Sequence, residues 1–377
     1  MIIGIPKETH PGEQRVSLIP SSVDRLVKKG AQVIVETGLG STIGVSDDEY
    51  KKAGATIEGN RKSLLSSSDI VLRLRKPPVE EIALLKKGSI HVSFLDPFNE
   101  KALVESLAQH HISAFSMEMI PRTTRAQKMD ALSSQANLAG YVTVILSAER
   151  LPKIFPMLMT PAGTIAPVKV FIIGVGVAGL QAIATAKRLG ARVEAFDTRP
   201  VVKEQVQSLG AKFVEIDLGE MGQTAQGYAK ALTPEQLEKQ RQGMAKVCSQ
   251  SDVIITTAQL FGRKAPVLLT KAMIDQMKSG TIIIDMAVET GGNVEGSKVN
   301  EEITTANGVR ILGLGNLPGR VAVHASQMYS ANLHNFVEEY WDKDNKLFKI
   351  NTDDEIIKGA LITHGGSIVN EMVKSIK

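Results

Sequence analysis

Residues 122–137 carry a dense group of side chains that form hydrogen bonds of fixed geometry. The segment, RTTRAQKMDALSSQAN, contains Arg122, Gln127, Asp130 and Ser133, follows an apolar run and leads into a helical pattern. Guanidinium, amide, carboxylate and hydroxyl groups can together donate to and accept from one polar ligand. A solvated loop is the alternative interpretation, and this segment by itself does not decide between the two.

A second stretch predicts a phosphate-binding turn. VKVFIIGVGVAGLQAIATAKRLG contains G-x-G-x-x-G at Gly174, Gly176 and Gly179, between an apolar run and an alanine-rich helical pattern. The first glycine permits a tight turn, the second lets the backbone approach a pyrophosphate, and the third allows close helix–strand packing. A helix that begins near Val177 would add free N–H groups and a partial positive charge. This context favours a dinucleotide site over a glycine turn without a ligand.

The end of the next strand pattern indicates which dinucleotide binds. Asp197 lies eighteen residues after Gly179, where a carboxylate can accept hydrogen bonds from ribose hydroxyls and would repel a 2′-phosphate. Thr198 and Arg199 follow directly. Arg199 weakens the inference slightly, because an arginine can also accommodate a 2′-phosphate. The pattern as a whole favours NAD(H) over NADP(H).

Composition excludes several classes of function. The 377 residues are 43% hydrophobic and 22% charged, with a net charge of +4 spread without basic tracts, which gives no support to nucleic-acid or membrane-surface binding. The single cysteine, Cys248, rules out an internal disulfide and fits a reducing compartment. No secretory signal, metal-binding cluster or apolar run long enough for a bilayer is evident. We therefore expect a soluble chain without direct membrane insertion.

Apolar runs alternate with amphipathic helical patterns along most of the chain, which is typical of parallel sheets covered by helices. We predict an α/β protein with two Rossmann-like, doubly wound parallel-sheet domains separated by a cleft. The N-terminal domain would comprise 1–137 and be completed by 326–377, and 138–325 would form the NAD(H)-binding domain. The predicted strands are 1–5, 31–37, 68–74, 89–95, 111–117, 168–173, 192–197, 212–217, 252–257, 281–286 and 309–314.

GIPKETHPGEQRV and the glycine-rich stretch resemble the group shared by alanine dehydrogenases and the NAD(H)-binding component of proton-translocating NAD(P) transhydrogenase. The 122–141 segment resembles the glutamine-containing active-site loop of the transhydrogenase component. The resemblance implies direct transfer of a hydride from C4 of NADH, bound here, to C4 of NADP⁺ on a partner subunit. It assigns catalytic roles to Gln127, Arg122, Asp130 and Ser133, with Gln127 closest to the incoming nicotinamide.

The resemblance also implies further contacts with NAD(H). Gly227 and Tyr228 lie in the glycine-rich segment 218–233, which resembles the family's mobile loop over the bound nucleotide, although an ordinary flexible excursion is the alternative. Gln259 follows a strand pattern and would line the adenine or ribose side. Arg125 and Gln240 complete the predicted set, and Arg125 is equally well explained as a solvated charge.

Two other functions stay open at this point. Alanine dehydrogenases resemble the chain around VLRLRKPP and SFLDPF, but they carry a substrate-binding lysine and a catalytic histidine where this chain has Arg75 and Asp96. Arg15 matches their substrate arginine. Without an amine and an imidazole, reductive amination lacks its acid–base groups. The third possibility is a non-catalytic NAD(H) sensor.

The resemblance implies several partners. A hairpin predicted at 155–168 would contact a second copy in a homodimer, with packing inside its own domain as the alternative. A membrane-embedded subunit and an NADP(H)-binding subunit would be required for activity, since no second dinucleotide motif of similar quality is evident. The expected enzyme is a Re/Si-specific, proton-translocating NAD(P)⁺ transhydrogenase. It would be cytoplasmic and attached peripherally to the inner membrane through those partners.

Overall fold

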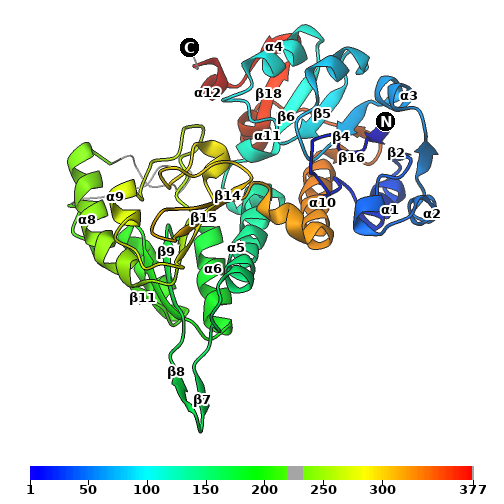
Figure 1. Cartoon of the computed structure of the whole chain (residues 1–377). Coiled ribbons are helices and arrows are strands. Elements are labelled where there is room, and N and C mark those ends of the chain that lie inside the picture. Colours follow the sequence, from blue (N-terminus) through cyan, green and yellow to red (C-terminus); the bar gives the residue numbers. More distant parts are fainter. Residues whose placement is uncertain (220–231, 376–377) are drawn as a thin grey trace. The chain divides into compact units, whose positions relative to one another are not determined.

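The computed structural model describes residues 1–219 and 232–375, which form two compact units (Figure 1). Unit 1 comprises Met1–Gln135 and Gly319–Lys377, and unit 2 comprises Ala136–Pro318. The change from unit 1 to unit 2 falls inside helix α5, Ala131–Arg150. Within the described ranges, no helix has both the length and the apolar character needed to cross a membrane.

Unit 1 is built on an eight-stranded sheet in the order β19-β18-β6-β5-β4-β1-β2-β3. Its strands are β1 Ile2–Ile5, β2 Gln32–Glu36, β3 Thr56–Glu58, β4 Ile70–Leu72, β5 Ile90–Ser93, β6 Ser113–Ser116, β18 Leu361–His364 and β19 Ser367–Ile368, with a separate hairpin of β16 Trp341–Asp342 and β17 Leu347–Phe348. Its α-helices are α1 Pro20–Lys28, α2 Asp47–Lys52, α3 Arg61–Ser67, α4 Lys101–Gln109, α10 Ala322–Glu339, α11 Glu355–Ala360 and α12 Glu371–Lys374.

The C-terminal segment completes the unit 1 sheet and its core. Strands β1 to β6 pair in parallel, whereas β18 pairs with β6 in the antiparallel sense. One face of the sheet packs on α10, whose Tyr329, Leu333 and Phe336 are fully buried in a cluster with Ile3 and Leu72. The segment after unit 2 is therefore part of the unit 1 core.

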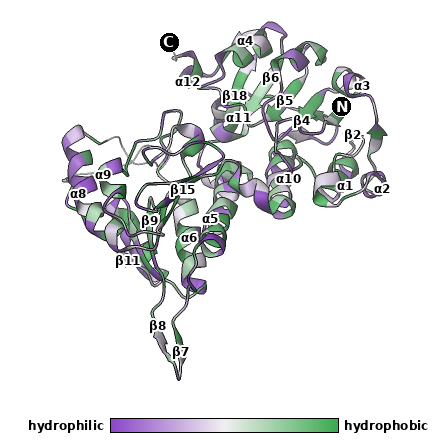
Figure 2. Ribbon diagram, in the orientation of Figure 1, coloured by the Kyte–Doolittle hydropathy of each residue, from purple (hydrophilic) through white to green (hydrophobic). Residues whose placement is uncertain are grey.

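Unit 2 contains a seven-stranded sheet in the order β11-β10-β9-β12-β13-β15-β14, parallel except for the edge strand β14. Its strands are β9 Lys169–Ile173, β10 Arg192–Phe196, β11 Lys212–Phe213, β12 Val253–Thr256, β13 Ile282–Asp285, β14 Glu301–Thr304 and β15 Arg310–Gly313. Beyond α5, its α-helices are α6 Val177–Arg188, α7 Lys203–Ser208, α8 Pro234–Gln250 and α9 Lys271–Ile274. Hydrophobic residues colour the central strands of both sheets in Figure 2.

The predicted strands correspond to β1, β2, β4, β5, β6, β9, β10, β12, β13 and β15, which confirms the α/β fold class. The prediction at 212–217 is too long, because β11 ends at Phe213 and only this edge position pairs with β10. The predicted hairpin exists as β7, Leu158–Thr160, and β8, Gly163–Ile165. Strands β3, β14 and β18 carry weaker apolar patterns or lie at sheet edges, and the sequence did not identify them.

Candidate functional site

The turn between β9 and α6 has two glycines that packing requires and one that faces open space. Gly174 has a φ of +96°, and a Cβ there would lie 2.5 Å from the Thr257 Oγ1. A Cβ on Gly179 would lie 2.0 Å from the carbonyl oxygen of Gly174. A Cβ on Gly176 would meet no described atom within 4 Å beyond its chain neighbours. The backbone is therefore open to a ligand at Gly176, directly before Val177 begins α6.

Asp197, at the end of β10, fixes the same turn. Its Oδ2 accepts the Val175 backbone N–H at 2.7 Å, and its Oδ1 accepts the backbone N–H of Arg199 at 2.8 Å. The Arg199 guanidinium also donates to both carboxylate oxygens, from Nε at 2.9 Å and from Nη2 at 2.8 Å. Thr198 lies between them and is half-buried. Arg199 is thus held against the acid that the sequence predicted to bind ribose.

The loop after β13 supports the end of β12, a role that was not predicted from the sequence. The side chain of Asn293 accepts the Ala258 N–H at 3.0 Å and donates to the Ala258 carbonyl at 2.9 Å. Asp285 is fully buried and accepts the Asn293 N–H at 3.0 Å. Gln259 is exposed, and its Nε2 donates to the Met286 carbonyl at 3.4 Å. An acid ending a strand and an asparagine after two glycines were the available signals.

Gln240 is the one predicted cofactor residue that lies on α8. Its side chain is 3% exposed, and its Oε1 has no hydrogen-bond partner among the described residues. Met244 and Cys248, one and two turns further on, pack into the core of unit 2. Because α8 leads into β12, its N-terminal half is directed toward the carboxyl edge of the sheet. Buried polar atoms normally have a partner, so this oxygen is available to a ligand donor or a water molecule.

These features of unit 2 fit a dinucleotide. The open backbone at Gly176 suits a pyrophosphate, and the free N–H groups at the start of α6 suit its charge. Asp197 is 9% exposed at the carboxyl edge of the sheet, the place where open α/β sheets bind ligands. Gly227 and Tyr228 lie outside the described residues.

The predicted catalytic loop of unit 1 follows β6 as a short helix, η4, Thr124–Met129. Ala126 and Met129 are 1% and 0% exposed and anchor it in the unit 1 core. Arg122 and Gln127 lie on its exposed side. The alternation of buried small or apolar residues with exposed polar ones gives a fixed loop that presents polar side chains to solvent.

Asp130 and Ser133 bond to each other at the start of α5. The Asp130 carboxylate accepts the Ser133 backbone N–H at 2.9 Å and its hydroxyl at 2.6 Å, an arrangement that caps the helix. Arg125 forms an ion pair with Asp354, 2.5 Å from Nη2 to Oδ2, although the arginine side chain is 44% exposed. Arg125 therefore has a structural partner of its own.

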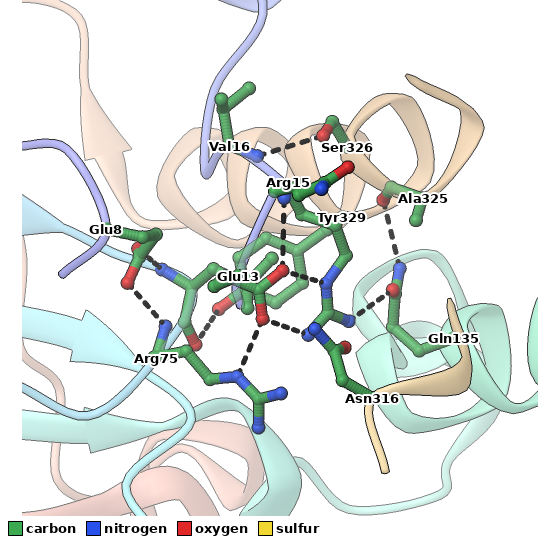
Figure 3. Close-up of polar contacts among 12 residues, drawn as sticks. Glu8, Glu13, Arg15, Val16, Arg75, Gln135, Asn316, Ala325, Ser326 and Tyr329 are labelled. Carbon is green, nitrogen blue, oxygen red and sulfur yellow. Dashed lines mark hydrogen bonds and ion pairs between the residues drawn. The ribbon is translucent and has the colours of Figure 1, made fainter. Parts of the chain in front are cut away.

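A buried carboxylate holds two arginines at the carboxyl edge of the unit 1 sheet (Figure 3). Glu13 accepts Arg15 Nη2 at 2.7 Å and Arg75 Nε at 2.8 Å, and its side chain is 0% exposed. Burial alone would raise the pKa of Glu13, but the two guanidinium groups lower it to about 2. The Arg15 Nη1 also donates to the Gln135 side chain at 2.8 Å. Both arginines stood out in the sequence, but Glu13 did not stand out as their shared partner.

The neighbouring strand edge does not offer a histidine acid. Asp96 has a φ of +52° and a half-exposed side chain, and its backbone N–H donates to Glu118. His91 lies inside β5 and is 0% exposed. Burial, with a smaller contribution from the charge of Arg73, lowers the pKa of His91 to about 3. At neutral pH this imidazole is therefore uncharged and cannot act as a general acid.

Known proteins resemble the chain over its whole length. At 45% identity it matches an NAD(P) transhydrogenase alpha subunit of Rhodospirillum rubrum, covering 98% of both chains. A solved structure of transhydrogenase from Sinorhizobium meliloti is 41% identical, with a TM-score of 0.88 over 98% of this chain and all of that one. An L-alanine dehydrogenase structure is 25% identical, with a TM-score of 0.83 over 100% of this chain and 99% of that one.

Two family models also match the chain. The model described as "Alanine dehydrogenase/PNT, N-terminal domain" covers residues 4–139, and the one described as "Alanine dehydrogenase/PNT, C-terminal domain" covers residues 143–371. The matches agree with the glycine turn and with the resemblance of the N-terminal motif. The chain therefore belongs to the alanine dehydrogenase/PNT family, and its relatives of 40–45% identity are transhydrogenase alpha subunits.

Proposed function

We propose that this chain is the NAD(H)-binding component of a proton-translocating transhydrogenase. In this reaction a hydride passes from C4 of NADH bound here directly to C4 of NADP⁺ bound on a partner subunit. The observation that carries the proposal is the exposed Gln127 on a loop anchored by Ala126 and Met129, in a chain whose relatives are transhydrogenase alpha subunits. An exposed amide on a fixed loop suits contact with a second nicotinamide.

The protein's task in such a transfer is orientation, because the cofactor supplies the hydride. The backbone at Gly176 and the first turn of α6 would bind the pyrophosphate, and Asp197 the adenosine ribose. Arg122, Gln127 and the capped Asp130–Ser133 pair would bind the nicotinamide end through hydrogen bonds. Two rings held at near-attack distance with water excluded need no general acid or base.

The cluster around Glu13 argues against amino-acid oxidation. A 2-oxo acid needs an unpaired cationic group for its carboxylate, but Arg15 and Arg75 both bind the internal Glu13 carboxylate. The reaction also needs a proton donor, and His91 is uncharged at neutral pH while Asp96 is a carboxylate. These groups favour a transhydrogenase over an alanine dehydrogenase. A sensor without catalysis leaves the exposed Gln127 unexplained.

We propose NAD(H) over NADP(H) as the nucleotide of this chain. The guanidinium of Arg199 is held by Asp197 and also donates to the Val175 carbonyl at 3.1 Å. It is therefore engaged in fixing the turn, whereas a 2′-phosphate site needs an arginine directed at the ligand. A 2′-phosphate would also meet the negative charge of Asp197.

An exposed apolar surface supports a homodimer. On the β7–β8 hairpin, Met157, Met159 and Ile165 are 58%, 71% and 51% exposed. Large apolar side chains clustered on an extended hairpin indicate a protein interface. We expect Met159→Asp to shift the sedimentation coefficient from dimer to monomer without lowering the melting temperature, and an unchanged dimer would contradict this interface.

The remaining partners are a membrane-embedded subunit and an NADP(H)-binding subunit. Through them the chain would be attached peripherally to the cytoplasmic face of the inner membrane. The names of the relatives, which call them alpha subunits, support a complex of several subunits.

The direct test mixes the purified chain with a purified NADP(H)-binding transhydrogenase domain. Reduction of a spectrally distinct NADP⁺ analogue by NADH should occur in the mixture and with neither protein alone. In parallel, the chain alone is supplied with L-alanine and NAD⁺. Rapid alanine oxidation without transfer in the mixture would favour the dehydrogenase, and NADH binding with neither activity would favour the sensor.

A further inference from the structure

One carbonyl group in the 122–134 loop receives two side-chain amides from α10. The Lys128 carbonyl accepts Asn332 Nδ2 and Asn335 Nδ2, both at 3.0 Å. The same Asn332 side chain accepts the Ser134 hydroxyl at 2.7 Å through its Oδ1. Asn332 is 7% exposed, whereas its bond partners lie 204 and 198 residues away in the sequence.

We propose that Asn332 is a positioning residue for hydride transfer, an inference that rests on the proposed function. Its amide joins the backbone directly after Gln127 to the first turn of α5, directly after Ser133. One buried side chain therefore fixes both ends of the segment that carries Gln127, Asp130 and Ser133. Asn332 need not touch a cofactor to affect the rate, because it sets where those groups lie.

The other contacts of this loop provide less directional control. Lys128 pairs with Glu339 at 2.7 Å and Arg125 pairs with Asp354, but the lysine and arginine side chains are 49% and 44% exposed. Exposed ion pairs contribute little, since solvent screens them and long side chains must be ordered. Apolar anchoring by Met129 buries the loop without defining its hydrogen-bonding direction. A buried amide with both ends bonded provides that direction.

The chain offers a graded set of variants. Asn332→Asp keeps the shape and the acceptor for Ser134, but it loses the donor to Lys128 and places a carboxylate against that carbonyl. Ser134→Ala removes only the bond to Oδ1. Asn335→Ala is the matched control, because it removes the other amide from the same carbonyl and leaves the Asn332 bonds intact.

We expect Asn332→Asp to lower the hydride-transfer rate with the NADP(H)-binding domain by about 10-fold or more, since small displacements of positioned groups have effects of this size. Ser134→Ala should lower it by a smaller factor. The NADH dissociation constant, dominated by the glycine turn, should change by less than about 2-fold, and Asn335→Ala should behave like the unmodified chain. A merely structural residue would instead change binding and rate together.

Amide hydrogen exchange provides a readout that does not depend on activity. In Asn332→Asp, exchange in the peptide 122–134 should rise about fivefold, the effect of losing one net hydrogen bond, while exchange in β9 stays constant. A rate within 2-fold of the unmodified chain, or unchanged exchange in 122–134, would overturn the proposal. If the unmodified chain itself transfers no hydride, the proposed function fails, and the exchange data alone decide whether Asn332 holds the loop.

Discussion

The glycine turn of unit 2 and the 122–134 loop of unit 1 both follow central strands, but they are built in opposite ways. The turn is a backbone structure, in which Gly174 and Gly179 are required by contacts within 83 residues along the chain and Gly176 leaves space for a ligand. The loop is a side-chain structure that depends on Asn332, 204 residues from its partner Lys128. A local backbone motif is therefore visible in the sequence, whereas a loop fixed from a distance is not.

The largest effect should come from filling the close approach in the turn. In Gly179→Val the new side chain would meet the Gly174 carbonyl oxygen, 2.0 Å from the Cβ position, so that α6 and β9 must separate. We expect loss of measurable NADH binding by calorimetry and a lower melting temperature, because overpacking costs about 1–3 kcal/mol.

Gly176→Ala is the matched control for the turn. Its Cβ would meet no described atom within 4 Å beyond the chain neighbours, so the melting temperature should not change. NADH affinity should still fall, because the methyl group occupies space that the pyrophosphate needs. Equal effects of the two substitutions on stability would contradict the division of roles among these glycines.

Glu13→Gln should have the next largest effect, on the stability of unit 1. Removing one partner from a buried ion cluster typically costs about 3–5 kcal/mol, and Arg15 and Arg75 would both lose theirs. The pKa of Glu13 is lowered from 4.5 to about 2 in the folded chain. Its contribution, about 3 kcal/mol, is thus complete above the usual pKa and is lost as the pH falls toward 2.

Denaturant titrations at a series of pH values check this prediction. The difference in unfolding free energy between the unmodified chain and Glu13→Gln should be largest near neutral pH and shrink below about pH 4. A difference that is independent of pH would show that packing, and not the carboxylate charge, accounts for the destabilisation.

Gln127→Ala should separate the two regions functionally. The amide is exposed, so folding and NADH binding should be retained, while hydride transfer in the mixture falls by about 100-fold through loss of orientation. Stopped-flow transfer rates and calorimetric NADH binding give the two numbers. A parallel loss of both would assign Gln127 to nucleotide binding instead.

The smallest effect is expected from Arg125→Ala. The arginine is 44% exposed and paired with Asp354, and exposed pairs contribute little. Transfer rate and NADH affinity should each stay within about 2-fold. A loss comparable with that of Gln127→Ala would show that Arg125 contacts the cofactor directly.

The same contrast explains which regions of the molecule were predictable. Long apolar strands such as β9 and β13 identify themselves, because both faces are buried in a parallel sheet. The end of β11 was placed too late, since 214–217 continue the apolar alternation without pairing in the sheet. Edge strands β3 and β14 have too few apolar residues to be recognised.

The candidate site divides in the same manner. G-x-G-x-x-G has a fixed local spacing, so Gly174, Gly176 and Gly179 were evident. Glu13 was missed because its role depends on two arginines brought together by different strands. Asn332 was missed because nothing near it in the sequence reports the return of α10 to the unit 1 core.

Isotope transfer tests the central claim most directly. NADH carrying deuterium at the transferred C4 position is mixed with the chain, the NADP(H)-binding domain and NADP⁺ in ordinary water, and the NADPH formed is analysed by mass spectrometry. Direct transfer predicts one deuterium per NADPH and none lost to solvent. NADPH without deuterium, or none formed while NADH remains bound, would contradict the account.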